Sequence, residues 1–154
     1  LKTVPAFQTA KQQERLDTLI VQAVFKQGEQ KAEKGDHAGA AKAYLRAAKE
    51  FPRDQRAAQA CVNAALSAQK AGDLATLKQA GQLSISKEYR DRPESPQGAW
   101  VAASTLQSMG LFGEAADFHE GIVANADREH PHYQKFEHTR DAAYNAVVLR
   151  VATG

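Results

Sequence analysis

Histidines and carboxylates gather in the last third of the chain, where they suggest metal binding. Such side chains hold a metal ion when several of them converge at short, regular spacings. Here His130 and His132 flank a proline in a predicted loop, and no cysteine or second close histidine pair completes a ligand set. The spacing therefore predicts no metal site from these histidines with Glu129 and Glu137. It predicts solvated or helix-capping side chains for the histidines, which are His119, His130, His132 and His138.

The nucleophilic side chains are also poorly placed for chemistry. Cys61 is the only cysteine, which excludes an internal disulfide, and it falls at a predicted core position. Ser84 and Ser86 have no base at a recognisable spacing. The glycine–aspartate pairs at 35–36 and 72–73 are typical of helix turns and are not part of a phosphate-binding loop. The sequence predicts a protein that is not an enzyme and has no cofactor.

The elements that position these residues are helices, and residues 21–52 form the clearest unit. Small or apolar residues recur there at steps of three and four, which is the spacing of one helical face. Gly35 and Asp36 interrupt the pattern, as expected for a left-handed C-terminal glycine followed by an N-cap aspartate. Pro52 ends the second helix. The unit is therefore a predicted pair of antiparallel helices, closely packed at Gly28.

Degenerate copies of this unit recur along the chain. The turn glycines at 35, 72, 110 and 154 are separated by 37, 38 and 44 residues. The copy at 58–89 has Leu77 and Gly81 where an alanine and an aromatic are expected in its second helix. In the copy at 96–126 the aromatic Phe118 comes one residue early, with His119 in its place. A fourth copy, from Arg140, supplies only a first helix.

The first unit resembles a tetratricopeptide repeat. Counting Val21 as the first position, the residues that match the family pattern are Gly28, Ala40, Tyr44, Ala47 and Pro52. It departs from the pattern at Val24, Gln27 and Lys31, where the family has Trp, Leu and Tyr. The resemblance implies an all-α fold, a right-handed α-solenoid of antiparallel helix pairs with about three and a half repeats.

Apolar spacing places further helices at 55–71, 74–88, 99–109, 113–125 and 133–151, with loops at 89–97 and 126–132. Residues 10–20 also read as helical, either as a separate helix or as an extension of the helix that follows. Asp54 is the expected N-cap of the helix at 55.

Composition fits one domain over residues 1–154. The hydrophobic fraction of 43% predicts a folded core. The net charge of +2 is small, so no nucleic-acid partner is expected. No apolar run approaches the ~20 residues of a membrane helix, so no direct membrane insertion is expected. No signal peptide is visible. Because the chain starts at Leu1 and stops on a turn glycine, we expect it to be an excised part of a longer chain.

In the family that the unit resembles, first helices line a concave groove that binds peptide segments. Carried over by position, the fifth residue of each unit is apolar or aromatic: Phe25, Val62, Trp100 and Tyr144. The other predicted groove residues are Glu29, Glu33, Leu66, Lys70 and Ser104. The aromatic members are the expected anchors, and the charged members are expected to set charge preference. Packing of the aromatic residues against neighbouring helices is the open alternative.

The resemblance thus implies a non-enzymatic scaffold that binds a protein or peptide partner. Two alternatives stay open. One is self-association into a homo-oligomer through the C-terminal helix, which carries an apolar face at Tyr144, Val147, Val148 and Val151. The other is a regulatory or targeting domain of a larger enzyme. Short segments at 49–54 and 87–96 also resemble bacterial extracytoplasmic members, of outer-membrane-assembly, Tol–Pal accessory and motility-complex types. This favours a periplasmic or envelope-associated location.

Overall fold

A computed structural model of the chain describes residues 6–154, which form eight helices and no strand. The predicted all-α fold is confirmed. The helices are α1 (Ala6–Glu33), α2 (His37–Glu50), α3 (Ala57–Ala71), α4 (Leu74–Ser84), α5 (Ser95–Ser108), α6 (Phe112–Asp127), α7 (Pro131–Gln134) and α8 (Thr139–Thr153).

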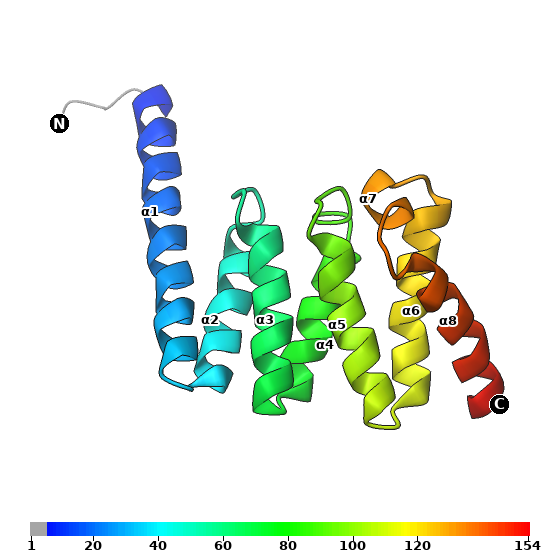
Figure 1. Ribbon diagram of the computed structural model, residues 1–154. Helices are drawn as coiled ribbons and strands as arrows, with labels where there is room; N and C mark the ends of the chain where they lie inside the picture. The colour runs from blue at the N-terminus through cyan, green and yellow to red at the C-terminus, as the bar shows by residue number, and fades with distance from the viewer. Residues whose placement is uncertain (1–5) are drawn as a thin grey trace.

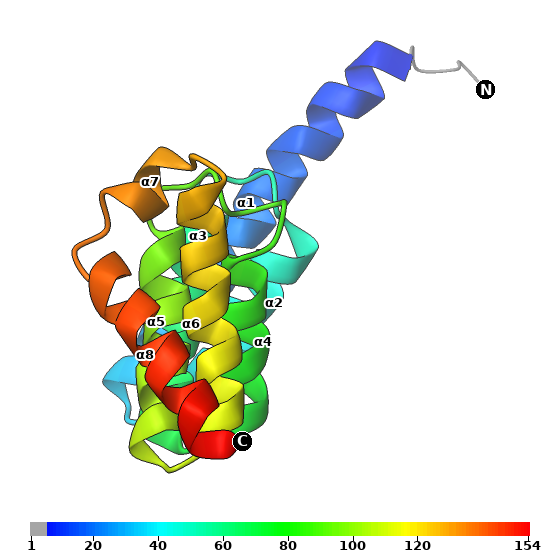
Figure 2. The same cartoon turned by 90° about the vertical axis from the view of Figure 1, so that its right-hand side faces the viewer.

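The helices stand side by side in chain order, from α1 at one end to α8 at the other (Figure 1). Each of α2, α4 and α6 packs against the helix before it, and α8 packs on α6. The side on which α3, α5 and α8 face the viewer in Figure 1 is called the first-helix face below. The end-on view in Figure 2 shows the N-terminal part of α1 projecting well beyond the other helices.

The predicted helix turns are confirmed. Gly35 and Gly72 have left-handed backbones, with φ of 79° and 68°. The carboxylates that follow them cap the next helices, because Asp36 accepts the Gly39 amide at 2.8 Å and Asp73 accepts the Thr76 amide at 3.0 Å. These hydrogen bonds hold the pKa of both carboxyl groups below its usual value.

Residues 10–20 extend the helix that follows them, which confirms one of the two predicted alternatives, because α1 is one continuous helix. Several other predicted boundaries need correction. The third helix starts at Ala57 and not at 55, because Asp54 binds the amide and side chain of Arg56 in a turn before the helix. The fourth ends at Ser84, four residues earlier than expected, and the fifth starts at Ser95, inside the predicted loop. The helix predicted over 133–151 is interrupted between α7 and α8.

A repeated connection explains the two wrong boundaries after Ser84 and after Gln134. The Tyr89 hydroxyl donates to the Ala48 carbonyl of α2 at 2.6 Å, and the Tyr133 hydroxyl donates to the Ser84 carbonyl of α4 at 2.7 Å. Six residues after each tyrosine, Ser95 or Thr139 donates its hydroxyl to that tyrosine's own carbonyl at 2.5 Å. The connection after α4 is thus bound to α2, and the connection after α6 is bound to α4. Each connection leads into the first helix of the next unit.

The core is built largely from alanine and glycine, which lets the helices approach closely. A Cβ at Gly28 would lie 2.8 Å from two ring atoms of Tyr44, so glycine makes room for the buried ring within the first pair. A Cβ at Gly81 would lie 2.6 Å from the Cβ of Ala102 and 2.9 Å from the Phe118 ring. Gly81, which departs from the expected aromatic, therefore seats Phe118 of the next pair.

Candidate functional site

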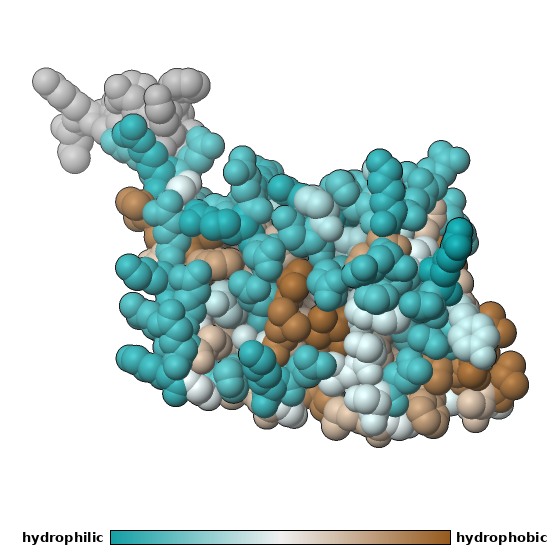
Figure 3. Space-filling model, viewed as in Figure 1, coloured by the Kyte–Doolittle hydropathy of each residue, from teal (hydrophilic) through white to brown (hydrophobic). Residues whose placement is uncertain are grey.

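The centre of the first-helix face is apolar. Val62 and Leu66, one turn apart on α3, are 5% and 38% exposed. Figure 3 shows hydrophobic surface in this region, surrounded by hydrophilic side chains. The opposite side of α3 carries Cys61, Ala65 and Ala68, all buried in the core. The helix is therefore fixed by its buried side, and Leu66 is held in place on a rigid support.

The predicted charged members of the groove are all exposed, two on α1 and one on α3. Glu29 and Glu33 are exposed on α1, and Lys70 is exposed near the end of α3. Ser104 is half-buried on α5 and donates its hydroxyl to the Trp100 carbonyl at 2.8 Å. Its proton is therefore used within its own helix. Glu29 and Glu33 thus present carboxylates on α1, and Lys70 presents an ammonium group one turn after Leu66 on α3.

Phe25 and Trp100 are both half-buried in aromatic contacts. Phe25 meets the Tyr44 ring edge to face at 5.1 Å. Trp100 stacks on His138 with ring centroids 4.4 Å apart and planes 9° from parallel, and it meets Phe136 edge to face at 6.3 Å. The predicted anchors are therefore partly occupied by intramolecular partners, which restricts the area that each offers to a ligand.

The cluster around Trp100 was not predicted from the sequence, where the histidines were weighed as metal ligands and were expected to be solvated or helix-capping. His138 comes from the connection between α7 and α8, so the stack joins two separate units. The spacing of Trp100 from His138 carries no local signal, because their contact depends on the tyrosine-anchored path of that connection. The candidate residues that sequence position alone could suggest are therefore those on the faces of single helices.

His119 is fully buried, which corrects the prediction of a solvated or capping side chain. Its Nε2 lies 3.0 Å from the Gln107 Oε1, and its Nδ1 has no hydrogen-bond partner. Burial lowers the pKa of His119 to about 4, so the ring is neutral at physiological pH. His130 pairs with Asp91 at 2.7 Å. Among residues 6–154, no group of three or more metal-ligating side chains converges.

Two of the nucleophilic side chains, Cys61 and Ser84, are buried in the core. Cys61 is buried as predicted, and burial raises the pKa of its thiol to about 12. The thiol is therefore protonated at neutral pH. Ser84 is buried and donates its hydroxyl to the Ala80 carbonyl at 3.0 Å. Both groups contribute to packing between α3 and α4.

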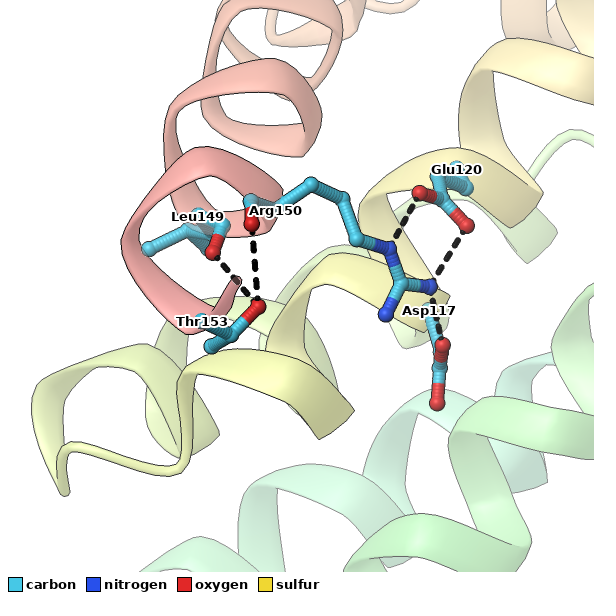
Figure 4. A network of polar contacts seen from close by, with 5 residues as sticks. All are labelled: Asp117, Glu120, Leu149, Arg150 and Thr153. Carbon is cyan, nitrogen blue, oxygen red and sulfur yellow. Dashed lines mark hydrogen bonds and ion pairs between the residues drawn. The ribbon is translucent and has the colours of Figure 1, made fainter.

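Tyr144 lies on α8, apart from the other predicted groove residues, and is 70% exposed. An arginine fixes this helix on α6. The Arg150 guanidinium reaches across to Glu120 at 2.7 and 2.8 Å and also to Asp117 (Figure 4). These contacts raise the pKa of Arg150 and lower that of Glu120. The orientation of Tyr144 is therefore set by the seating of α8.

A hollow lies elsewhere, between the projecting part of α1 and the α2–α3 connection. It measures about 1100 Å³, and its apolar lining residues are Val21, Phe51 and Pro52. Carboxylates and arginines line its walls, among them Glu14, Asp17, Glu50, Arg53 and Arg56. Sequence reasoning missed this cleft, because it arises only when residues 10–20 extend α1 beyond the connection.

Comparison with protein-family models, with curated proteins and with solved structures found no match. The resemblance to tetratricopeptide repeats therefore rests on the residues quoted above. No helix in the described part of the chain is both long enough and apolar enough to cross a membrane.

Proposed function

We propose that the chain is a tetratricopeptide-like α-solenoid that acts as a non-enzymatic scaffold and binds a segment of a partner protein on its first-helix face. The observation that carries this proposal is Leu66. It is a large apolar side chain, exposed at a position that the family resemblance assigns to the groove, on a helix whose opposite side is buried. Apolar residues on rigid supports are typical binding anchors.

The partner's chemistry follows from the residues around Leu66. An apolar side chain of the partner would cover Leu66, one turn from the largely buried Val62. The exposed carboxylates Glu29 and Glu33 favour a basic residue toward α1, and Lys70 favours an acidic one near the end of α3. Because the helices are already packed, little side-chain and backbone entropy is lost when the segment binds.

Phe25, Trp100, Ser104 and Tyr144 stay predicted contacts at the ends of this surface. Trp100 contributes only the part of its ring that His138 leaves uncovered. The binding energy is therefore expected to centre on α3, with smaller contributions from α1 and α5.

The test is site-specific photo-crosslinking in extract of the source organism, with a photoreactive residue at Leu66 or at Leu19. Leu19 is a matched control, since it is a leucine that is 62% exposed on α1. Adducts unique to position 66 would identify the partner segment. A synthetic copy of that segment is then titrated by fluorescence anisotropy against the wild type and against Leu66→Glu and Leu19→Glu.

We expect Leu66→Glu to weaken binding at least ~10-fold, with Leu19→Glu close to the wild type. Equal adducts at both positions, or equal affinities of the two variants for the segment, would overturn the proposal. Circular dichroism of both variants controls for folding.

A further inference from the structure

The terminal helix α8 is apolar on two opposite sides. Ala142, Ala146 and Leu149 are buried, which places them against α6. Turned about half a helical revolution away, a second stripe is exposed, formed by Tyr144, Val147, Val148 and Val151. Figure 3 shows hydrophobic side chains over this end of the molecule as well. The stripe is the widest cluster of exposed large hydrophobics on any described helix.

The helices α3 and α5 have the same place in their units as α8 has in the last unit, so their equivalent positions can be compared with those of α8. At the fourth, eighth and eleventh positions of their units, α3 has Cys61, Ala65 and Ala68, and α5 has Ala99, Ala103 and Leu106. All six are buried, because α4 and α6 pack over the two helices. The same positions of α8 are Ala143, Val147 and Arg150, and all three are exposed. Within the described residues, this side is therefore packed on α3 and α5 and exposed on α8.

We propose that a second copy of this chain covers the exposed stripe, so that two α8 helices pack antiparallel about a two-fold axis. The spacing of the stripe is self-complementary. With the axis between Val147 and Val148, these two residues face each other across the interface, and Tyr144 of each copy meets Val151 of the other. Every large apolar residue of the stripe then has an apolar partner.

Charges do not oppose this arrangement. Arg150 would lie beside the neutral Asn145 of the other copy, in the same antiparallel register. Its own charge is already bound by Glu120 and Asp117 of α6. The antiparallel order also places the opposite ends of the two helix dipoles together. The interface thus brings no like charges into contact at its centre.

The area of the stripe sets the expected strength. With 70% of Tyr144 and 65% of Val147 exposed, and two further valines, it offers on the order of 400 Å² of side-chain surface. A standard interface buries ~800 Å² per partner. The dimer is therefore expected to be weak, with a Kd on the order of 0.1 mM. This inference is independent of the proposed function, which concerns Leu66 on α3.

The test is sedimentation equilibrium of the chain from micromolar concentrations to about 1 mM. The weight-average mass is expected to rise from 16.7 kDa toward twice that value. Val147→Lys places two positive charges at the axis and should weaken association at least ~10-fold. Leu19→Lys is the matched control, because Leu19 is 62% exposed and Val147 is 65% exposed. It should associate like the wild type.

Disulfide trapping supplies a second readout that does not depend on affinity. Val147→Cys should form a covalent dimer under mild oxidation, since the two copies of residue 147 lie near the axis, whereas Leu19→Cys should not. Cys61 is buried and does not interfere. A constant mass of 16.7 kDa at every concentration would overturn the inference. Equal weakening by Val147→Lys and Leu19→Lys, or equal trapping at both positions, would also overturn it.

Discussion

The Tyr133 hydroxyl is expected to contribute measurably to stability, and Tyr133→Phe isolates that contribution. Tyr133 is fully buried, and its hydroxyl donates to the Ser84 carbonyl at 2.7 Å. Ser84 is the last residue of α4, so its carbonyl is among the four that have no partner within the helix. Phenylalanine keeps the ring and removes the donor, which leaves a buried acceptor unpaired.

The magnitude follows from that geometry. Loss of a buried hydrogen bond that leaves an unpaired acceptor costs about 1–2 kcal/mol of unfolding free energy. No cavity penalty is added, because the ring volume is retained. A loss of 1 kcal/mol in a chain of this size lowers Tm by ~2–4 °C. We therefore expect Tyr133→Phe to fold normally and to unfold at lower urea concentration.

Urea titration followed by circular dichroism measures the effect, with Tyr144→Phe as the matched control. Tyr144 is 70% exposed, so its variant should stay within ~0.5 kcal/mol of the wild type. Equal midpoints for the two variants would refute the role given to the hydroxyl.

Alkaline pH gives a second readout of the same bond. Burial raises the pKa of Tyr133 above its ordinary value of about 10. The protonated hydroxyl is favoured in the folded chain, so its stabilisation is complete below pH ~10 and is lost as the pH rises above that value. Tyr133→Phe should therefore lose less stability than the wild type between about pH 9 and pH 11.

Two further predictions concern buried residues of the core. Because the pKa of His119 is lowered to about 4, the folded chain should lose stability as the pH falls below ~6.5, by at most ~1.4 kcal/mol per pH unit. Urea midpoints between pH 7 and pH 5 should fall less steeply in His119→Gln, and equal slopes would contradict this. Gly28→Ala should destabilise by about 1–2 kcal/mol in urea titration, because its Cβ would meet the Tyr44 ring at 2.8 Å. Gly113→Ala meets nothing within 4 Å, so it should not destabilise, and equal effects of the two substitutions would contradict the close approach at Gly28.

The helix turns were predictable because their chemistry is local. A glycine that adopts positive φ and an aspartate that caps the next amide lie side by side in the sequence, as at Gly35–Asp36 and Gly72–Asp73. The connections after Ser84 and after Gln134 were mispredicted because their anchors lie in other units. One signal was available there: Tyr89 and Tyr133 are 44 residues apart, and each is followed six residues later by a serine or a threonine.

The candidate site likewise contains residues that the sequence could predict and contacts that it could not. Val62 and Leu66 were assigned to the predicted groove by carrying over repeat positions from the family that the first unit resembles. The stack of Trp100 on His138 depends on where a connection from another unit comes to rest, and helical spacing carries no information about that. The burial of His119 likewise depends on packing between helices, since its ring contacts Gln107 and Trp100 of α5.

The two proposed surfaces meet only at α8, and this affects how they work together. Tyr144 belongs both to the predicted groove and to the stripe that a second copy would cover, whereas Val62 and Leu66 on α3 belong to the groove alone. Dimerisation would therefore remove the α8 end from the groove and leave its centre open. Since the apolar centre lies on α3 and Trp100 is already stacked on His138, loss of Tyr144 leaves the proposed anchor in place. A dimer joined through α8 would thus present two such centres, and a partner with two copies of the bound segment would gain affinity from binding both.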